Sequence, residues 1–306
     1  MSWRKPHGTA GSSPGLCRPE CRRPRGRGGD AQLIAGAALV DQTPDRALLT
    51  SNSRHAELIL HRADHSSLRA VGLETLHPEN VDEVARRARE AGLAIVSETP
   101  SLPVIERAVS VAFPEGHVIE VHTPMPRDRP ARYAGPGIHP RYLDHANLTA
   151  RDPATSAQLM MQVLGLKLTE RTEGWELAWM RAGDGRHHTV AFAKSAEGGG
   201  LHHYSWEFAD FADFKRLGDV LDAKDRTLVW GPGRHGAGDN IFAYYVDAAG
   251  FLVENTAEME IIADPHFQAR IVDPGENLSN YKVVNRWGQL PSQDWLTHFN
   301  ACAVLG

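Results

Sequence analysis

The feature that most constrains the fold of this 306-residue chain is an internal repeat with a nearly constant offset. Segment 53–60 is similar to segment 185–192, which lies 132 positions later. Segment 68–74 corresponds to 201–207 at an offset of 133, and segment 116–120 corresponds to 250–254 at an offset of 134. The steady offset predicts two copies of one β-α-β-β-β unit.

Apolar patterning and turn residues place the elements of each copy. In the first half we expect a helix that begins at an Asn80 cap and ends at Gly92, and strands within 45–60, 68–76, 107–113 and 117–122. In the second half we expect helices capped by Asp152 and Asp210, and strands at 142–148, 176–181, 187–193, 201–208, 240–246 and 251–256. The predicted fold class is α+β, with two tandem domains of paired βαβββ modules.

Composition divides the chain further. Residues 1–30 are rich in Arg, Gly, Pro and Ser, and they bury too little apolar surface to offset the entropy of ordering, so we expect disorder there. The second copy is expected to open with a strand and a helix at 142–165. The corresponding stretch of the first copy, roughly residues 6 to 45, shows no such strand and helix, so the first module is predicted to be incomplete. The predicted divisions are a basic leader 1–30, an N-terminal non-catalytic domain 31–125, a proline-rich linker 126–140, a C-terminal catalytic metal-binding domain 141–262, and a tail 263–306 that packs on the body.

Charge and cysteine content exclude several classes of protein. The chain has a net charge of −5, of which the first thirty residues carry +5 and the remainder −10, and this argues against nucleic acid as a partner. The sequence has no run of eighteen apolar residues, so we expect no membrane partner. Cys17, Cys21 and Cys302 cannot build a disulfide framework, and the leader lacks the apolar region of a secretory signal. We expect a cytoplasmic protein.

Three predicted strands of the second copy each carry a possible metal ligand where an apolar side chain would be expected: His145, His203 and Glu254. A single histidine on a strand is more often a hydrogen-bonded core residue than a ligand. Three strands that each contribute one donor favour a metal site. Two imidazoles and one carboxylate form a set typical of non-haem Fe(II), which leaves coordination positions open.

The two copies differ at these positions. Ala56 stands where the second copy has His188, and Ala70 stands where it has His203. Of the compared positions, only Glu120 has the same residue as the second copy, where Glu254 stands. We interpret Glu120 as an ordinary polar strand residue. The comparison predicts one metal site, in the second copy.

The motifs Arg186-His-His-Thr and Leu201-His-His, and the segment 231–235 followed by Tyr244 and Glu254, resemble extradiol ring-cleaving dioxygenases. The resemblance is to the catechol 2,3-dioxygenase and dihydroxybiphenyl dioxygenase kind, within the vicinal oxygen chelate superfamily, and it covers roughly residues 45 to 295. It implies that each pair of modules forms a half-open β-barrel. The barrel of the C-terminal domain would surround the metal.

The resemblance also implies an activity, the incorporation of both atoms of O2 during meta-cleavage of a catechol-type ring in aromatic degradation, and a homo-oligomer. His145, His203 and Glu254 would bind Fe(II), with Mn(II) as the other candidate ion. The remaining residues carried over by position are His188 as the acid-base histidine, His235 and Tyr244 at the substrate's hydroxyl oxygens, and Asn147 and Trp179 in the substrate and oxygen pocket.

Two other functions remain open. One is a metal-dependent isomerase or lyase of the glyoxalase type, which typically draws ligands from both modules, and Ala56 and Ala70 argue against it. The other is a metal-free small-molecule-binding protein, which would have no use for His188 and Tyr244 beside a metal triad. We expect the neighbouring His187 and His202 to be structural, because they alternate to the opposite strand face.

Overall fold

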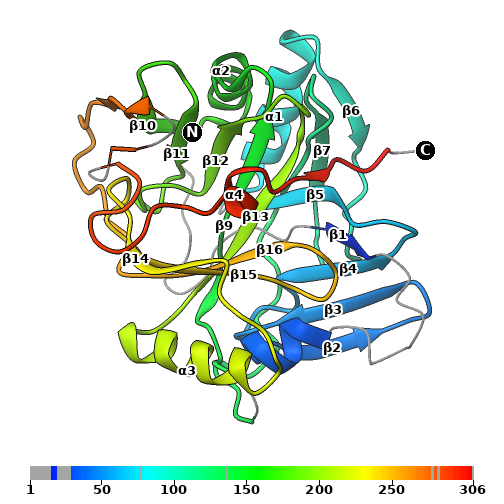
Figure 1. Cartoon of the computed structure of the whole chain (residues 1–306). Helices are drawn as coiled ribbons and strands as arrows, with labels where there is room; N and C mark the ends of the chain where they lie inside the picture. Colours follow the sequence, from blue (N-terminus) through cyan, green and yellow to red (C-terminus); the bar gives the residue numbers. More distant parts are fainter. Residues whose placement is uncertain are drawn as a thin grey trace.

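The computed structural model describes residues 15–18, 29–75, 77–135, 137–276, 279–280 and 283–304. Two sheets dominate it, one from each half of the chain (Figure 1). The first sheet has eight strands in the order β2-β3-β4-β1-β5-β8-β7-β6. The second has ten, of which nine follow the order β14-β15-β16-β13-β9-β12-β11-β10-β17, while β18 pairs with β13.

The first half consists of β1 (Gly15–Arg18), η1 (Ala31–Ala35), β2 (Ala38–Gln42), β3 (Arg46–Thr50), β4 (Leu58–Arg62), β5 (Ser67–Glu74), α1 (Glu79–Glu90), β6 (Ala94–Ser97), β7 (Ala108–Ala112) and β8 (Val118–His122). The second half consists of β9 (Tyr142–Ala150), α2 (Pro153–Leu164), β10 (Lys167–Thr172), β11 (Leu177–Arg181), β12 (Val190–Lys194), β13 (Gly200–Glu207), α3 (Phe211–Asp222), β14 (Trp230–Arg234), β15 (Ile241–Val246), β16 (Leu252–Ala257), β17 (Arg270–Val272), α4 (Gln293–Leu296) and β18 (Asn300–Ala301).

The strand orders confirm the predicted duplication. In the first sheet β1 lies between β4 and β5, as β9 lies between β12 and β13 in the second, and the remaining strands follow the same order on either side. The first copy is reduced, as predicted. Strand β1 has four residues against nine in β9, and helix η1 has five against twelve in α2.

Local signals predicted two helix starts correctly and one wrongly. Asp152 caps α2 by accepting a hydrogen bond from Thr155 N at 3.1 Å, and Asp210 caps α3 by accepting one from Ala212 N at 2.8 Å. The predicted Asn80 cap is wrong, because α1 begins at Glu79 and the Asn80 side chain donates to Thr75 Oγ1 instead. A local hydrogen bond to the residue just after β5 therefore replaces the capping role of Asn80.

Several strand boundaries also differ from the expectation. The predicted strand within 45–60 is two strands, β3 and β4, separated by a turn, and the predicted strand 187–193 begins only at Val190. Strands β6, β10 and β14 were not predicted from the sequence. In β14 the segment Gly-Pro-Gly has a composition typical of a loop, which hides the strand.

One buried apolar cluster runs through both halves, from Ile34 and Val71 in the first copy to Phe192 and Phe251 in the second. Helices α1 and α2 contact each other at the top of Figure 1. No helix among the described residues is long and apolar enough to cross a membrane. The packing thus joins the two copies and holds the second sheet against the first.

The remaining predicted divisions can be compared with the described residues only in part. Of the leader 1–30, the structure describes the short strand β1 and residues 29–30, and the rest of the leader lies outside the described residues. The described part of 126–140 contains no helix or strand. In the tail, Trp295 is buried against the body, whereas Trp287 is exposed.

A carboxylate from the first copy holds the strand that carries His145. Glu57 is fully buried and accepts hydrogen bonds from Ser51 N at 2.7 Å, Asn52 Nδ2 at 2.7 Å and Leu143 N at 3.2 Å. Leu143 lies in β9, two residues before His145. The side chain therefore fixes the start of β9 relative to the first sheet.

We predict that Glu57→Ala lowers the free energy of unfolding by about 3 kcal/mol, because it leaves several buried donors without an acceptor, at about 1–3 kcal/mol each. Chemical denaturation followed by tryptophan fluorescence measures the change. Glu79→Ala, at an exposed carboxylate, is the control and should change the value by less than about 0.5 kcal/mol. Equal stability of the two variants would contradict the role given to Glu57.

Candidate metal centre

Three side chains from neighbouring strands converge on one buried point. His145 comes from β9, His203 from β13 and Glu254 from β16, and these strands are adjacent in the second sheet. Each residue offers one ligand atom, these atoms all lie within 4.8 Å of one another, and none of the three side chains is more than 3% exposed. Among the described residues this is the only such group of histidine, cysteine or acidic side chains.

Glu254 lies between the two imidazoles. Its Oε2 atom is 2.7 Å from His145 Nε2 and 3.2 Å from His203 Nε2. Its Oε1 atom accepts a hydrogen bond from Asn240 Nδ2, which also donates to Thr256 Oγ1 at 2.7 Å. Asn240 thus orients the carboxylate, a role that the sequence did not indicate.

The hydrogen bonds of His202 fix which nitrogen of His203 is free. His202 Nε2 lies 2.8 Å from the carbonyl oxygen of Trp295 and must donate to it, because a carbonyl cannot donate. In the neutral ring, His202 Nδ1 then accepts from His203 Nδ1, at 2.7 Å. This arrangement leaves His203 Nε2 without a proton and directed at the convergence point, the state that metal binding requires.

His145 is oriented by Asp144, the residue that precedes it in the chain. Its Nδ1 atom lies 2.7 Å from Asp144 Oδ2, to which it donates, so its Nε2 atom faces Glu254. Asp144 is fully buried and also pairs with Arg186, whose Nε lies 2.8 Å from Asp144 Oδ1. A carboxylate behind a histidine ligand is a common arrangement in metal sites, because it orients the ring and raises its basicity.

His188 shows the same pattern one strand away. His187 Nε2 lies 3.2 Å from Glu170 Oε2 and donates to it, and His187 Nδ1 lies 3.0 Å from His188 Nδ1. His188 therefore donates through Nδ1 and keeps a bare Nε2. His187 and His202, which we expected to be structural, are both buried and set the tautomers of their neighbours.

All eight residues predicted for the site line one small cavity of about 40 Å³: His145, Asn147, Trp179, His188, His203, His235, Tyr244 and Glu254. Tyr244 Oη lies 3.0 Å from His235 Nε2, and His235 Nδ1 lies 2.6 Å from the carbonyl oxygen of Val284. Asn147 Oδ1 is buried and makes no hydrogen bond. The structure therefore brings together every residue that the sequence singled out.

The sequence missed part of the cavity wall. Ala237, Val283, Val284 and Trp295 also line it, and three of these four belong to the segment after β17. The Trp295 ring lies 5.6 Å from that of Tyr244 and 4.6 Å from that of His202. No local sequence pattern identifies these residues. Val283, Val284 and Trp295 reach the cavity only because the tail folds back over the second sheet.

Burial and neighbouring charges set the protonation states. Burial lowers the pKa of His145, but Glu254 and Asp144 outweigh it and raise the pKa to about 9. Burial lowers the pKa of His203 to about 4 and that of His188 well below its ordinary value. Although burial favours protonation of Glu254, His145 and His203 hold its pKa well below the usual range.

With a pKa of about 9, His145 is protonated at neutral pH, so a metal ion would have to displace the proton on its Nε2 atom, whereas the other groups already suit a cation site. Glu254 remains ionised at neutral pH and His188 remains neutral, while burial raises the pKa of Tyr244 well above its usual value and keeps the phenol protonated. Two imidazole nitrogens and one carboxylate oxygen can bind a divalent transition metal and leave coordination positions open toward the cavity. The donor set therefore fits a metal ion.

Comparisons with known proteins agree with this fold. Residues 142–255 match the family model described as Glyoxalase/Bleomycin resistance protein/Dioxygenase superfamily. The manganese-dependent 2,3-dihydroxybiphenyl 1,2-dioxygenase of Geobacillus genomosp. 3 is 25% identical over 256 residues, which cover 77% of this chain and 81% of that protein.

Solved structures share the whole architecture. The Mn(II)-bound glyoxalase from Novosphingobium aromaticivorans superposes with a TM-score of 0.81 at 22% identity, covering 95% of this chain and 94% of the other. An extradiol ring-cleaving dioxygenase from B. fuscum superposes with a TM-score of 0.84 at 20% identity, covering 96% of this chain and 82% of the other. At these identities the likeness establishes the fold.

We predict that His202→Leu weakens Mn(II) binding by about tenfold or more, because His203 Nδ1 loses the acceptor that orients the ring. Competition with a chelator of known affinity measures the change. His266→Leu, at an exposed histidine outside the site, is the matched control and should bind as the unaltered chain does. Unchanged Mn(II) affinity in His202→Leu would contradict the orienting role.

Proposed function

Because residues 142–255 form a domain of the glyoxalase, bleomycin resistance protein and dioxygenase superfamily, we propose that the protein is a metal-dependent extradiol dioxygenase that cleaves catechol-type rings with O2. The observation that carries the proposal is the convergence of His145, His203 and Glu254 beside His188, His235 and Tyr244 in one cavity. The first group is a cation site, and the second supplies groups that can accept and return protons.

His145, His203 and Glu254 would hold the metal ion. This donor set is typical of non-haem Fe(II), and the name of one relative at 25% identity specifies manganese. Such an ion supplies open coordination positions for the two catechol oxygens and for dioxygen, together with the redox chemistry that activates dioxygen. We favour iron, and manganese is the other candidate.

Tyr244 and His235 can take the proton that a catechol loses on binding. His235 donates through Nδ1 to Val284, so its Nε2 atom accepts the Tyr244 hydroxyl proton. A substrate hydroxyl that donates to Tyr244 Oη can therefore pass its proton along this chain to His235. The imidazolium that forms keeps its hydrogen bond to the Val284 carbonyl.

His188 provides a second acid-base group on a different wall. Its Nε2 atom is bare and its ring centroid lies 4.3 Å from that of His145, so it stands close to the proposed ion without joining the three ligands. A neutral imidazole there can take a proton from the reacting oxygens and deliver it to the product. Asn147 and Trp179 complete the wall of the oxygen and substrate pocket.

Substrate entry requires the cavity to widen. Its volume of about 40 Å³ has room for a few water molecules, each of which needs about 10–15 Å³ of such space, and a catechol ring is larger. The wall from Val283, Val284 and Trp295 belongs to the tail, outside the paired modules. We infer that displacement of this wall admits the ring.

An isomerase or lyase with ligands from both copies is a weaker candidate. Ala56 and Ala70 stand in the first copy where His188 and His203 stand in the second, so the first copy lacks the imidazoles. The Glu120 carboxylate, the counterpart of Glu254, accepts hydrogen bonds from Ser101 and has no imidazole ligand beside it at the position of Ala70. The complete donor set within the second copy favours the single-site chemistry of the dioxygenase.

We predict that anaerobic loading with Fe(II), followed by a catechol and air, gives a yellow ring-fission product, because extradiol cleavage leaves a conjugated semialdehyde or ketone. Absorbance is followed for catechol, 2,3-dihydroxybiphenyl and 3,4-dihydroxyphenylacetate, with Mn(II) loading in parallel. Metal-free protein is the control and should give no colour. A folded, metal-loaded protein that cleaves none of the three would contradict the proposal.

Metal retention should separate two of the histidines. We predict that His203→Ala abolishes stoichiometric iron binding, whereas His188→Ala retains iron and loses about a hundredfold in turnover rate, the size typical of a lost acid-base group. Iron content by mass spectrometry and initial rates measure the two effects, with His266→Ala as the control. Equal iron loss in both variants would overturn the assignment of His188.

A further inference from the structure

The first copy contains a cavity of about 390 Å³ at the place that corresponds to the metal centre. It is lined from β4, β5, β6, β7 and β8 and from the segment between β6 and β7. By the repeat offsets, its lining residues Glu120 and Ala70 correspond to Glu254 and His203. Its volume lies within the roughly 300–1,000 Å³ typical of small-molecule sites.

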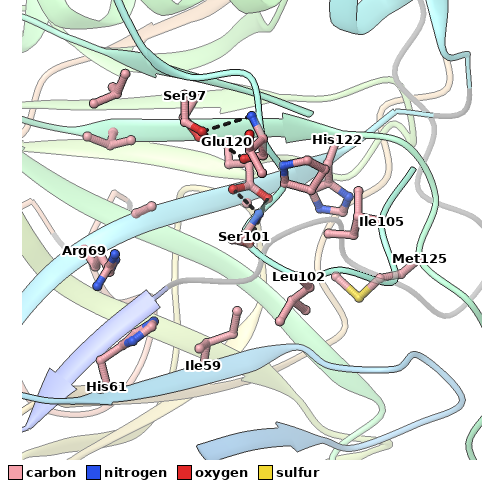
Figure 2. Close-up of a pocket in the computed structure, with 17 residues that line it drawn as sticks. Ile59, His61, Arg69, Ser97, Ser101, Leu102, Ile105, Glu120, His122 and Met125 are labelled. Carbon is pink, nitrogen blue, oxygen red and sulfur yellow. Dashed lines mark hydrogen bonds between the residues drawn. The ribbon is translucent and has the colours of Figure 1, made fainter. Parts of the chain in front are cut away.

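One end of this cavity is built from hydrogen-bond acceptors. Glu120 is 6% exposed and accepts from Ser101 Oγ at 2.9 Å and from Ser101 N at 3.2 Å, which leaves acceptor capacity on the carboxylate (Figure 2). His122, two residues further along β8, is 1% exposed and donates through Nδ1 to the carbonyl oxygen of Thr123 at 2.8 Å.

The remaining nitrogen of His122 has no hydrogen-bond partner among the described residues. Its Nε2 atom is buried without a hydrogen bond, and with the proton on Nδ1 it can only accept. A buried polar atom of this kind costs free energy unless a ligand satisfies it. The acceptor end, defined as Glu120 and His122, therefore suits a ligand that donates hydrogen bonds.

A single cation lies at another part of the rim. Arg69, on β5, is exposed and makes no ion pair or hydrogen bond with the described residues, and His61 lies beside it on β4 (Figure 2). Burial and the charge of Arg69 lower the pKa of His61 to about 4, so that ring is neutral at neutral pH. Arg69 thus offers one unpaired guanidinium, which suits a carboxylate.

The walls between these two ends are apolar. Ile59, Leu102, Ile105 and Met125 line the cavity, and each is at most 5% exposed. Figure 2 shows Ile59 and Leu102 between the side of Arg69 and the side of His122. The described residues here include no trio of metal-ligating side chains, so an organic ligand fits the lining better than a metal ion.

We propose that this cavity binds a small aromatic acid that carries a hydroxyl group at the end opposite its carboxylate. The hydroxyl donates to the acceptor end, the ring packs between Ile59, Leu102 and Met125, and the carboxylate pairs with Arg69. The site is distinct from the metal centre, and the proposal does not rest on the dioxygenase activity.

Methionine methyl groups provide a direct test in the full-length chain freed of metal by a chelator. The probe is 4-hydroxyphenylacetate, whose single hydroxyl cannot chelate a metal through two adjacent oxygens. In NMR spectra of protein with carbon-13-labelled methionine methyls, we expect a saturable shift of the Met125 signal, assigned with Met125→Leu. Met160 and Met180, buried in the second copy, should not shift.

Two variants test the chemistry of the ligand. Arg69→Gln should weaken binding of 4-hydroxyphenylacetate about tenfold and leave that of 4-methylphenol unchanged, because only the former presents a carboxylate. Ala70→Leu should abolish binding of both by filling the cavity. Arg62→Gln, at an exposed arginine of β4 outside the lining, is the matched control.

Each result decides the proposal. A Met125 shift with the stated dependence on Arg69 supports it, whether or not the protein cleaves catechols. Absence of a saturable Met125 shift, equal binding of 4-hydroxyphenylacetate in Arg69→Gln and the unaltered chain, or a shift confined to Met160 and Met180 would overturn it.

Discussion

The burial of Glu254 is the constraint on which the rest of the site depends. An ionised carboxylate inside a protein is costly unless opposite charge and hydrogen bonds compensate it. Here Asn240 donates to one oxygen, and the nitrogens of His145 and His203 face the other. The charged ring of His145 therefore compensates this carboxylate, and a divalent cation bound by Glu254 and by the bare Nε2 atom of His203 would compensate it as well.

Three of the four site histidines depend on the residue that precedes them in the chain. Asp144 accepts from His145, His187 from His188, and His202 from His203. Side chains of successive strand residues point to opposite faces, so the preceding residue lies behind the site and can reach the ring from its far side. This repeated local device fixes three tautomers, and it connects the cavity to partners as distant as Glu170 and the backbone of Trp295.

The sequence predicted the parts of the structure that depend on local pattern or on repetition. The offsets of 132 to 134 residues anticipated that β4, β5 and β8 correspond to β12, β13 and β16, and the comparison of the copies predicted a single site in the second copy. The sequence could not predict contacts between residues that lie far apart in the chain. Trp295 reaches the cavity only because the tail folds back over the second sheet. Asn80 failed as a predicted cap for a local reason, its side-chain hydrogen bond to Thr75 five residues earlier.

The two copies show how one framework supports two kinds of cavity. At an offset of 134 residues, Ser110 stands where the second copy has Tyr244, and Ser101 stands where it has His235. The second cavity, lined by these larger rings and by the tail residues Val283, Val284 and Trp295, measures about 40 Å³, whereas the first, with serines at the two positions, measures about 390 Å³. Because both cavities keep a buried glutamate on the matching strand, the difference lies in what surrounds it. Imidazoles around the carboxylate make a place for a cation, and serine with an unpaired histidine makes a place for a hydrogen-bond donor.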